Sequence, residues 1–169
     1  MHVDRPPVLH PPKGTSAPPP ERPAPVVFAQ PLAVLPRLAG ARVLVVEDDK
    51  DSRELLCVLL ELAGATVLGA ESVAEAMEDI HHSFDPDVVL TDYSMPIADG
   101  FDLIREFRRV PSTRAVAVPI LVLSGHTEDH WRARVLEAGA ADLLIKPVDP
   151  TFLITRIAAA VASVGGAPH

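Results

Sequence analysis

The segment VVLTDYSMPIADG, residues 88–100, decides how this sequence folds. Three apolar residues and a threonine lead directly into a single carboxylate, Asp92, and the turn-rich run SMPIADG follows. An apolar run of this kind, bounded by turn residues, is typical of a strand that is buried on both faces. Such a strand predicts a parallel sheet covered by helices, and it raises the question of why its end carries an acid.

The rest of the sequence repeats the same alternation of a strand and a helix. Five apolar runs are each followed by a segment with helical spacing of its apolar residues. Ser72 and Glu75 have the spacing of a capping box, and Gly64 and Gly139 can end helices. The predicted strands span residues 42–46, 65–70, 87–92, 118–125 and 141–147, and the predicted helices span residues 52–64, 72–82, 100–110, 127–140 and 150–164.

This alternation predicts an α/β fold. Strands that are apolar on both faces require helices on both sides of the sheet. Right-handed crossovers then give a doubly wound, five-stranded parallel sheet of the (βα)5 type. In such sheets the functional crevice lies outside the carboxyl ends of the strands.

The N-terminal segment has a different composition. Residues 1–36 hold eleven of the eighteen prolines, without a strand or helix period, and lose too many backbone donors to form a packed element. We expect a proline-rich disordered tail over residues 1–40, a folded domain over 41–164 and a flexible C-terminus over 165–169. The tail is a flexible leader, a docking arm for a partner with an aromatic groove, or an overlong gene start.

Charge and cysteine content limit the classes of partner and the cellular compartment that we expect. Residues 1–40 carry a net charge of +2 and residues 41–169 a net charge of −10, which argues against nucleic-acid binding and permits cation binding where acids converge. No apolar run reaches the roughly 18 residues of a membrane-spanning helix. Cys57 is the only cysteine, so we expect a cytoplasmic protein in which Cys57 is inert core packing.

Polar groups follow four of the five predicted strands. Carboxylates that crowd together repel one another, and a hard divalent cation such as Mg²⁺ relieves that repulsion. A metal with a nearby hydroxyl and ammonium suits phosphoryl transfer, with Asp92 as the nucleophile. Each group alone also fits a solvated helix start or an ordinary turn, so their joint placement carries the hypothesis. The groups are Glu47, Asp48 and Asp49 after the first strand, Asp92 at the end of the third, Ser124 after the fourth and Lys146 after the fifth.

These segments strongly resemble the receiver domain of two-component response regulators, which has the CheY-like, or flavodoxin-like, fold. The resemblance covers roughly residues 41–163 and rests on VLVVEDDKDSRELL, VVLTDYSMPIADG, ILVLSGH and GAADLLIKP. It implies that a phosphohistidine on a bacterial sensor histidine kinase or phosphotransfer protein donates its phosphoryl group to Asp92. The chain would be a signalling receiver and not a conventional enzyme. The receiver would catalyse its own phosphoryl transfer and slow autodephosphorylation.

The resemblance also implies a role for the other residues around Asp92. Ser124 takes the place of the switch hydroxyl, Lys146 takes that of the family's lysine, and the Lys146–Pro147 bond is expected to be cis. The implied Mg²⁺ ligands are Asp48 directly, Glu47 through water, Asp92 and the backbone carbonyl of Ser94.

Three further positions bear on tuning and switching. Ser94 and His126 lie at positions that flank the line of water attack in receivers, and would tune the phosphoryl lifetime. Family members often carry an aromatic residue where this chain has Leu143. Either an aliphatic rotamer change or a shift of helix 127–139 must therefore carry the signal, or the domain switches weakly. Trp131 on that helix is either partly buried or an exposed partner contact.

We expect a single-domain response regulator that signals through altered protein contacts at the surface formed by residues 127–163, with a homodimer through that surface as a further option. The alternative is a phosphorylation-independent interaction module or a phosphate sink. A hydrolase of the haloacid dehalogenase class needs a second aspartate where Ser94 stands. A flavodoxin-like flavin binder needs a phosphate loop where EDDKDS stands, so both are disfavoured.

Overall fold

The computed structural model describes residues 38–82, 84–110, 117–127 and 129–165. The predicted tail up to residue 37 and the last four residues of the predicted C-terminus lie outside the described residues. Leu38, which falls within the segment assigned to the tail, is buried, and its N–H donates to the carbonyl of Ala63 at 2.8 Å. The packed part of the chain therefore includes residue 38.

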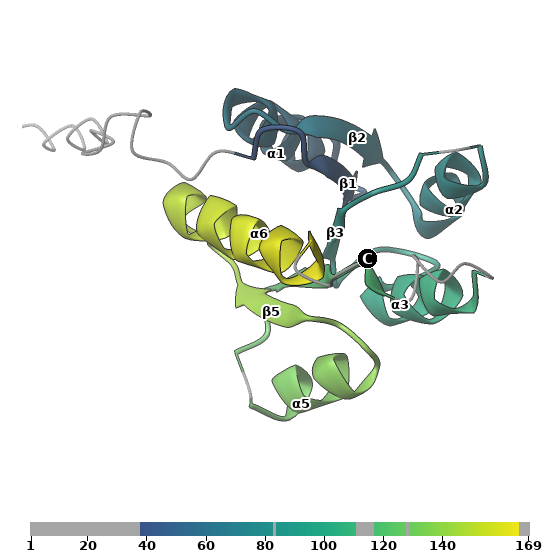
Figure 1. Ribbon diagram of the computed structural model, residues 1–169. Coiled ribbons are helices and arrows are strands. Elements are labelled where there is room, and N and C mark those ends of the chain that lie inside the picture. The colour runs from purple at the N-terminus through teal and green to yellow at the C-terminus, as the bar shows by residue number, and fades with distance from the viewer. Residues whose placement is uncertain (1–37, 83, 111–116, 128, 166–169) are drawn as a thin grey trace, which may run out of the picture. The chain divides into compact units, whose positions relative to one another are not determined.

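Strands and helices alternate through the described residues, in the order that the sequence predicts (Figure 1). The doubly wound α/β fold with five parallel strands is confirmed. The strands are β1 (Arg42–Val46), β2 (Thr66–Ala70), β3 (Val88–Asp92), β4 (Ile120–Ser124) and β5 (Asp142–Ile145), and the helices are α1 (Lys50–Leu62), α2 (Val73–His81), α3 (Gly100–Arg109), α5 (Asp129–Glu137) and α6 (Pro150–Gly165).

The strand order fixes where a site can form. The order across the sheet is β2-β1-β3-β4-β5, and every neighbouring pair is parallel. The chain moves outward from β1 in one direction to β2, and then returns to the other side of β1 to place β3. Helices leave β1 and β3 toward opposite faces, which opens a crevice at their carboxyl ends.

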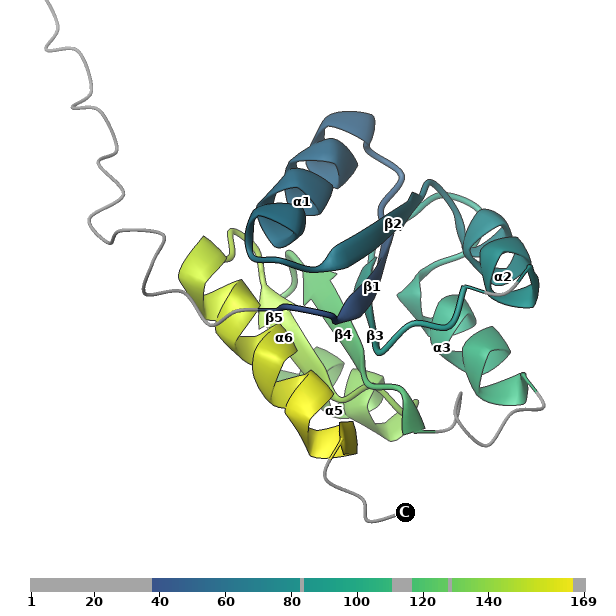
Figure 2. The same cartoon turned by 45° about the horizontal axis from the view of Figure 1, so that its top comes forward.

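Alternating side chains of the strands form two cores, one on each face of the sheet. Figure 2 shows α1 and α6 on one side of the sheet and α2 and α3 on the other. On β1, Val43 and Val45 face α1 and α6, whereas Leu44 and Val46 face α2, α3 and α5. β3 and β4 are buried along their whole length. Burial on both faces explains why these strands read as unbroken apolar runs.

Side-chain caps set the helix starts. The Asp49 carboxylate accepts from Ser52 N at 2.8 Å, so α1 begins at Lys50, two residues before the predicted start. Ser72 caps α2 as predicted, but the Glu75 carboxylate accepts from Glu71 N at 2.7 Å, so the predicted capping box is only half formed. A complete capping box begins α3, which the sequence prediction had missed.

Prolines shorten two strands relative to the prediction. β4 begins at Ile120 because Pro119 has no N–H to donate to the sheet. β5 ends at Ile145, although Lys146 N still donates to the carbonyl of Ser124 at 2.8 Å before Pro147 follows. The Lys146–Pro147 peptide bond is cis.

Two further properties concern membrane-spanning helices and the single cysteine. Within the described ranges, no helix has the length and apolarity needed to span a bilayer. Cys57 is half-buried against the core beneath α1 and α6, and burial raises the pKa of its thiol. A protonated, partly enclosed thiol reacts slowly, which supports the interpretation of Cys57 as a packing residue.

We predict that Phe107→Ala lowers the free energy of unfolding by about 3–5 kcal/mol, because it empties a fully buried position in the core beneath α3. Leu55→Ala on α1 is the control, since that side chain is 70% exposed and its loss should change stability by no more than about 0.5 kcal/mol. Urea denaturation followed by circular dichroism measures both. Equal losses for the two variants would contradict the described packing.

Candidate functional site

Three carboxylates meet at the carboxyl edge of the sheet. Parallel pairing sets Val46 of β1 against Thr91 of β3, so Glu47 and Asp92 leave neighbouring strands at the same height. Single carboxylate oxygens of Glu47, Asp48 and Asp92 all lie within 4.8 Å of one another. Glu47 and Asp92 are buried and Asp48 is exposed, so the cluster opens to solvent on one side.

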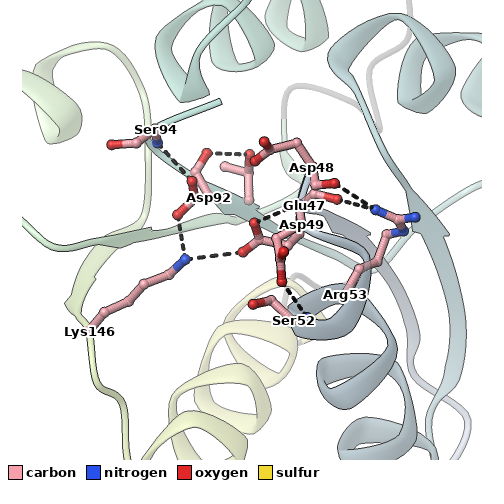
Figure 3. A network of polar contacts seen from close by, with 9 residues as sticks. Glu47, Asp48, Asp49, Ser52, Arg53, Asp92, Ser94 and Lys146 are labelled. Carbon is pink, nitrogen blue, oxygen red and sulfur yellow. Dashed lines mark hydrogen bonds and ion pairs between the residues drawn. The ribbon is translucent and has the colours of Figure 1, made fainter. Parts of the chain in front are cut away.

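The Lys146 ammonium lies between two of these acids (Figure 3). Its Nζ is 2.6 Å from Oδ1 of Asp92 and 3.1 Å from Oε2 of Glu47. Burial alone would lower the Lys146 pKa, but the bonds to Asp92 and Glu47 outweigh it and the pKa is raised. For Glu47, burial is the largest cause and the carboxyl pKa is raised, although the hydrogen bond and the charge of Lys146 lower it.

Backbone geometry holds Asp92 in place. The amide of Ser94 donates to Oδ2 of Asp92 at 2.9 Å, and the hydroxyl of Thr91 donates to the Asp92 carbonyl at 3.0 Å. Gly100, at the start of α3, packs so closely that a Cβ there would be 3.1 Å from that same carbonyl. The start of α3 and the end of β3 therefore form one rigid support for the carboxylate.

Ser124 lies one strand away from Asp92. The register pairs Asp92 with Leu123, which puts the next residue, Ser124, beside Tyr93. Ser124 is buried, and its Oγ accepts from the backbone N of His126 at 3.0 Å. The hydroxyl and its loop thus flank the acidic cluster.

The other predicted positions lie around this edge. Leu143 is buried in β5 beside Val122, in the core that includes Val135 of α5. His126 and Trp131 are half-buried and their rings stack, so of the two options for Trp131 the structure favours partial burial. Pro147 is exposed.

Sequence reasoning missed Arg53, whose guanidinium donates hydrogen bonds to the backbone of the acidic loop after β1. Its Nη1 donates to the carbonyl of Glu47 at 2.6 Å and to that of Asp48 at 3.3 Å (Figure 3). Gly69 of β2 makes room for it, because a Cβ at Gly69 would be 3.3 Å from Cγ of Arg53. The spacing of one helical turn after the cap residue Asp49 could have placed Arg53 next to this loop.

Sequence reasoning also missed Asp142, a buried acid at the start of β5. It forms ion pairs with Arg132 of α5, at 2.6 Å, and with Arg156 of α6. Arg132 also donates to the carbonyl of Leu143 at 2.9 Å. These contacts tie together helices on opposite faces of the sheet, at the edge formed by β5.

Comparison with known proteins identifies the family that has this fold and this acidic edge. The family model of the response regulator receiver domain matches residues 43–158. The chain belongs to this family. Receiver domains are signalling proteins that interact with histidine kinases or phosphotransfer proteins.

Individual relatives support the assignment. The phosphate regulon transcriptional regulatory protein PhoB of Escherichia coli K12 is 36% identical over 123 residues, which cover 73% of this chain and 52% of PhoB. The chain thus spans about half the length of that relative. An uncharacterized 14.6 kDa protein of Leptolyngbya boryana is 38% identical over 120 residues, covering 71% of this chain and 89% of the relative.

Solved structures agree with the fold. A response regulator receiver domain protein of Clostridium thermocellum superposes with a TM-score of 0.66 at 29% identity, covering 73% of this chain and 95% of that one. The chemotaxis protein CheY4 of Vibrio cholerae gives a TM-score of 0.66 at 28% identity, covering 71% and 98%. The likeness therefore extends over nearly the whole of each of those domains.

We predict that Arg53→Ala speeds hydrogen exchange at the amides of residues 47–49. Removing a hydrogen bond to these carbonyls costs about 1 kcal/mol, which corresponds to roughly fivefold faster local opening. Lys50→Ala on the same helix is the control, because Lys50 is exposed and pairs with Glu54 at 3.6 Å. Exchange monitored by mass spectrometry should leave the control unchanged. Equal protection in Arg53→Ala and the parent would show that Arg53 does not restrain the loop.

Proposed function

We propose that Asp92 accepts a phosphoryl group from a phosphohistidine of a sensor histidine kinase or phosphotransfer protein. The supporting observation is the Lys146 ammonium 2.6 Å from Oδ1 of Asp92, with the Glu47 and Asp48 carboxylates beside it. A carboxylate oxygen of Asp92 attacks phosphorus and a new O–P bond forms. The N–P bond of the donor histidine breaks, and the imidazole leaves with the electron pair.

The donor set fits Mg²⁺. Glu47, Asp48 and Asp92 offer only carboxylate oxygens, which are the hard ligands that this ion prefers. The backbone carbonyl of Ser94 would complete the protein's share of the ligands. The ion supplies neutralisation of the negative charge that gathers when a phosphoryl group approaches three acids.

Charged and polar groups around Asp92 would orient the incoming group. The Lys146 ammonium, a compact point charge, would neutralise one phosphoryl oxygen. The Ser94 amide already points at Oδ2 of Asp92, and the hydroxyl of Ser124 lies on the adjacent strand. Ser94 and His126 would also set the lifetime of the aspartyl phosphate by controlling how water approaches it.

Phosphorylation would shift a population between two packings of the domain. The group adds nearly two negative charges beside Lys146, and Ser124 gains a charge-assisted hydrogen bond when it turns toward them. That bond can switch the domain only if the two packings differ by a few kcal/mol. The readout is a change in protein contacts at residues 127–163, including contact with a downstream target or a second copy of the domain formed by residues 41–164.

A small phosphodonor tests the proposal directly. Incubation of the protein with phosphoramidate and Mg²⁺ should add one phosphoryl group by intact-mass spectrometry, and Asp92→Asn should abolish the addition. Asp49→Asn is the matched control, because Asp49 is an adjacent acid outside the carboxylate cluster and asparagine still caps α1. It should be modified as fully as the parent.

The same assay separates the alternatives. Chelation of the metal with EDTA should prevent the addition, because the crowded carboxylates then repel the donor. Absence of any addition to the parent protein with Mg²⁺ present would contradict the proposal and favour a phosphorylation-independent interaction module. Addition to Asp92→Asn would place the acceptor elsewhere.

A further inference from the structure

An aromatic cluster borders the acidic edge on the side of α5. Tyr93, the residue after Asp92, has its ring centroid 5.6 Å from that of Phe101, 5.6 Å from that of His126 and 5.3 Å from that of Trp131, each in an edge-on arrangement. The rings of His126 and Trp131 stack at 5.0 Å with an angle of 27° between their planes. Arg134 covers the cluster, with its guanidinium 4.9 Å from the Trp131 ring and 5.3 Å from the Phe101 ring.

One end of this cluster is bonded to the loop after β4. The backbone N of His126 donates to Oγ of Ser124 at 3.0 Å, so the position of the imidazole depends on the position of that hydroxyl. Gly125 lies between them and is exposed, and a Cβ added there would meet nothing within 4 Å. The loop therefore has open space at Gly125.

The other end of the cluster belongs to α5. Trp131 and Arg134 are one helical turn apart, on the face of α5 that meets Tyr93 and Phe101. Phe101 and Arg134 also line a groove of about 580 Å³ between α3 and α5. A shift of α5 would therefore change both the ring contacts and the shape of this groove.

The core offers no ring at the position where a receiver often has one. Leu143 is buried in β5, and its side chain is aliphatic. The stacked rings of His126 and Trp131 instead form an aromatic connection from the loop of Ser124 to helix α5.

We propose that the stack of His126 on Trp131 transmits the state of Asp92 from the Ser124 hydroxyl to helix α5, and this rests on the proposed function of Asp92. When Ser124 turns toward a phosphoryl group, its bond to the His126 amide changes and the imidazole moves with the backbone. Trp131 follows because the two flat rings stay in contact. His126 and Trp131 are thus positioning residues that couple the acceptor to the output surface.

Beryllofluoride, a stable phosphoryl mimic, tests this with Mg²⁺ present. Its occupancy is measured by ¹⁹F NMR, and the response of α5 by hydrogen exchange over Asp129–Glu137. At saturation, His126→Ala should lose at least about half of the α5 response of the parent, and Trp131→Leu the same. His126→Phe restores a flat ring and should recover the response.

His130→Ala is the matched control. The His130 ring is exposed on α5 and tilted against Trp131 at 5.3 Å, but it lies outside the Ser124 loop. It should respond like the parent. A full response in His126→Ala would overturn the inference, as would an equal loss in His130→Ala.

A ligand-free measurement separates this inference from the proposed function. Trp131 is the only tryptophan, so its emission reports on the cluster. Ser124→Ala removes the acceptor of the His126 amide and should shift that emission without beryllofluoride. If the parent fails to bind beryllofluoride, the proposed function fails and this shift still decides the coupling. Unchanged emission and unchanged α5 exchange in Ser124→Ala would overturn the coupling.

Discussion

Three negative carboxylates occupy one small volume at the carboxyl ends of β1 and β3, and the Lys146 ammonium partly compensates them. The carboxylates repel one another, and several contacts around them oppose that repulsion. The loop after β1 cannot relax away from Asp92, because Arg53 holds its carbonyls. Asp92 is held near the other acids, because the Ser94 amide bonds its carboxylate and the start of α3 packs against its carbonyl. The fold thus keeps together acids that would otherwise move apart, and burial in this cluster raises the pKa of Glu47.

The strand order makes this concentration possible. β1 and β3 are neighbours in the sheet although α1, β2 and α2 separate them in the chain, so residues 47 and 92 leave the sheet side by side. β5 lies at the edge of the sheet, and the long side chain of Lys146 reaches from its end past β4 to Asp92 and Glu47. Each charged group is placed by a buried strand, which is a rigid element and limits local adjustment. The charged groups at this edge therefore hold fixed positions relative to one another.

Sequence alone predicted the strands and the acidic edge for a physical reason. Strands such as β3 are buried on both faces, so their apolar runs are long and their polar ends stand out. Long side chains that reach across elements were not predictable in this way. Arg132 donates to the carbonyl of Leu143 on the following strand, and no periodic pattern marks that contact. Arg53 lies one helical turn after the cap Asp49, so the sequence could have placed it near the loop but not predicted its hydrogen bond to the carbonyl of Glu47. The sequence prediction starts α1 two residues late, because helical spacing of apolar residues begins only after Lys50 and Asp51, whereas the carboxylate of Asp49 caps the helix in the structure.

We infer that the crowded acids at this edge form a metal site, and calorimetric titration with Mg²⁺ tests this most directly. The account predicts one ion per chain, with affinity at least about tenfold weaker in Asp48→Asn, since one of three carboxylate ligands loses its charge. Asp51→Asn, an exposed acid of α1 outside the cluster, should bind as the parent does. Absence of binding, or equal binding by the parent and Asp48→Asn, would contradict the account.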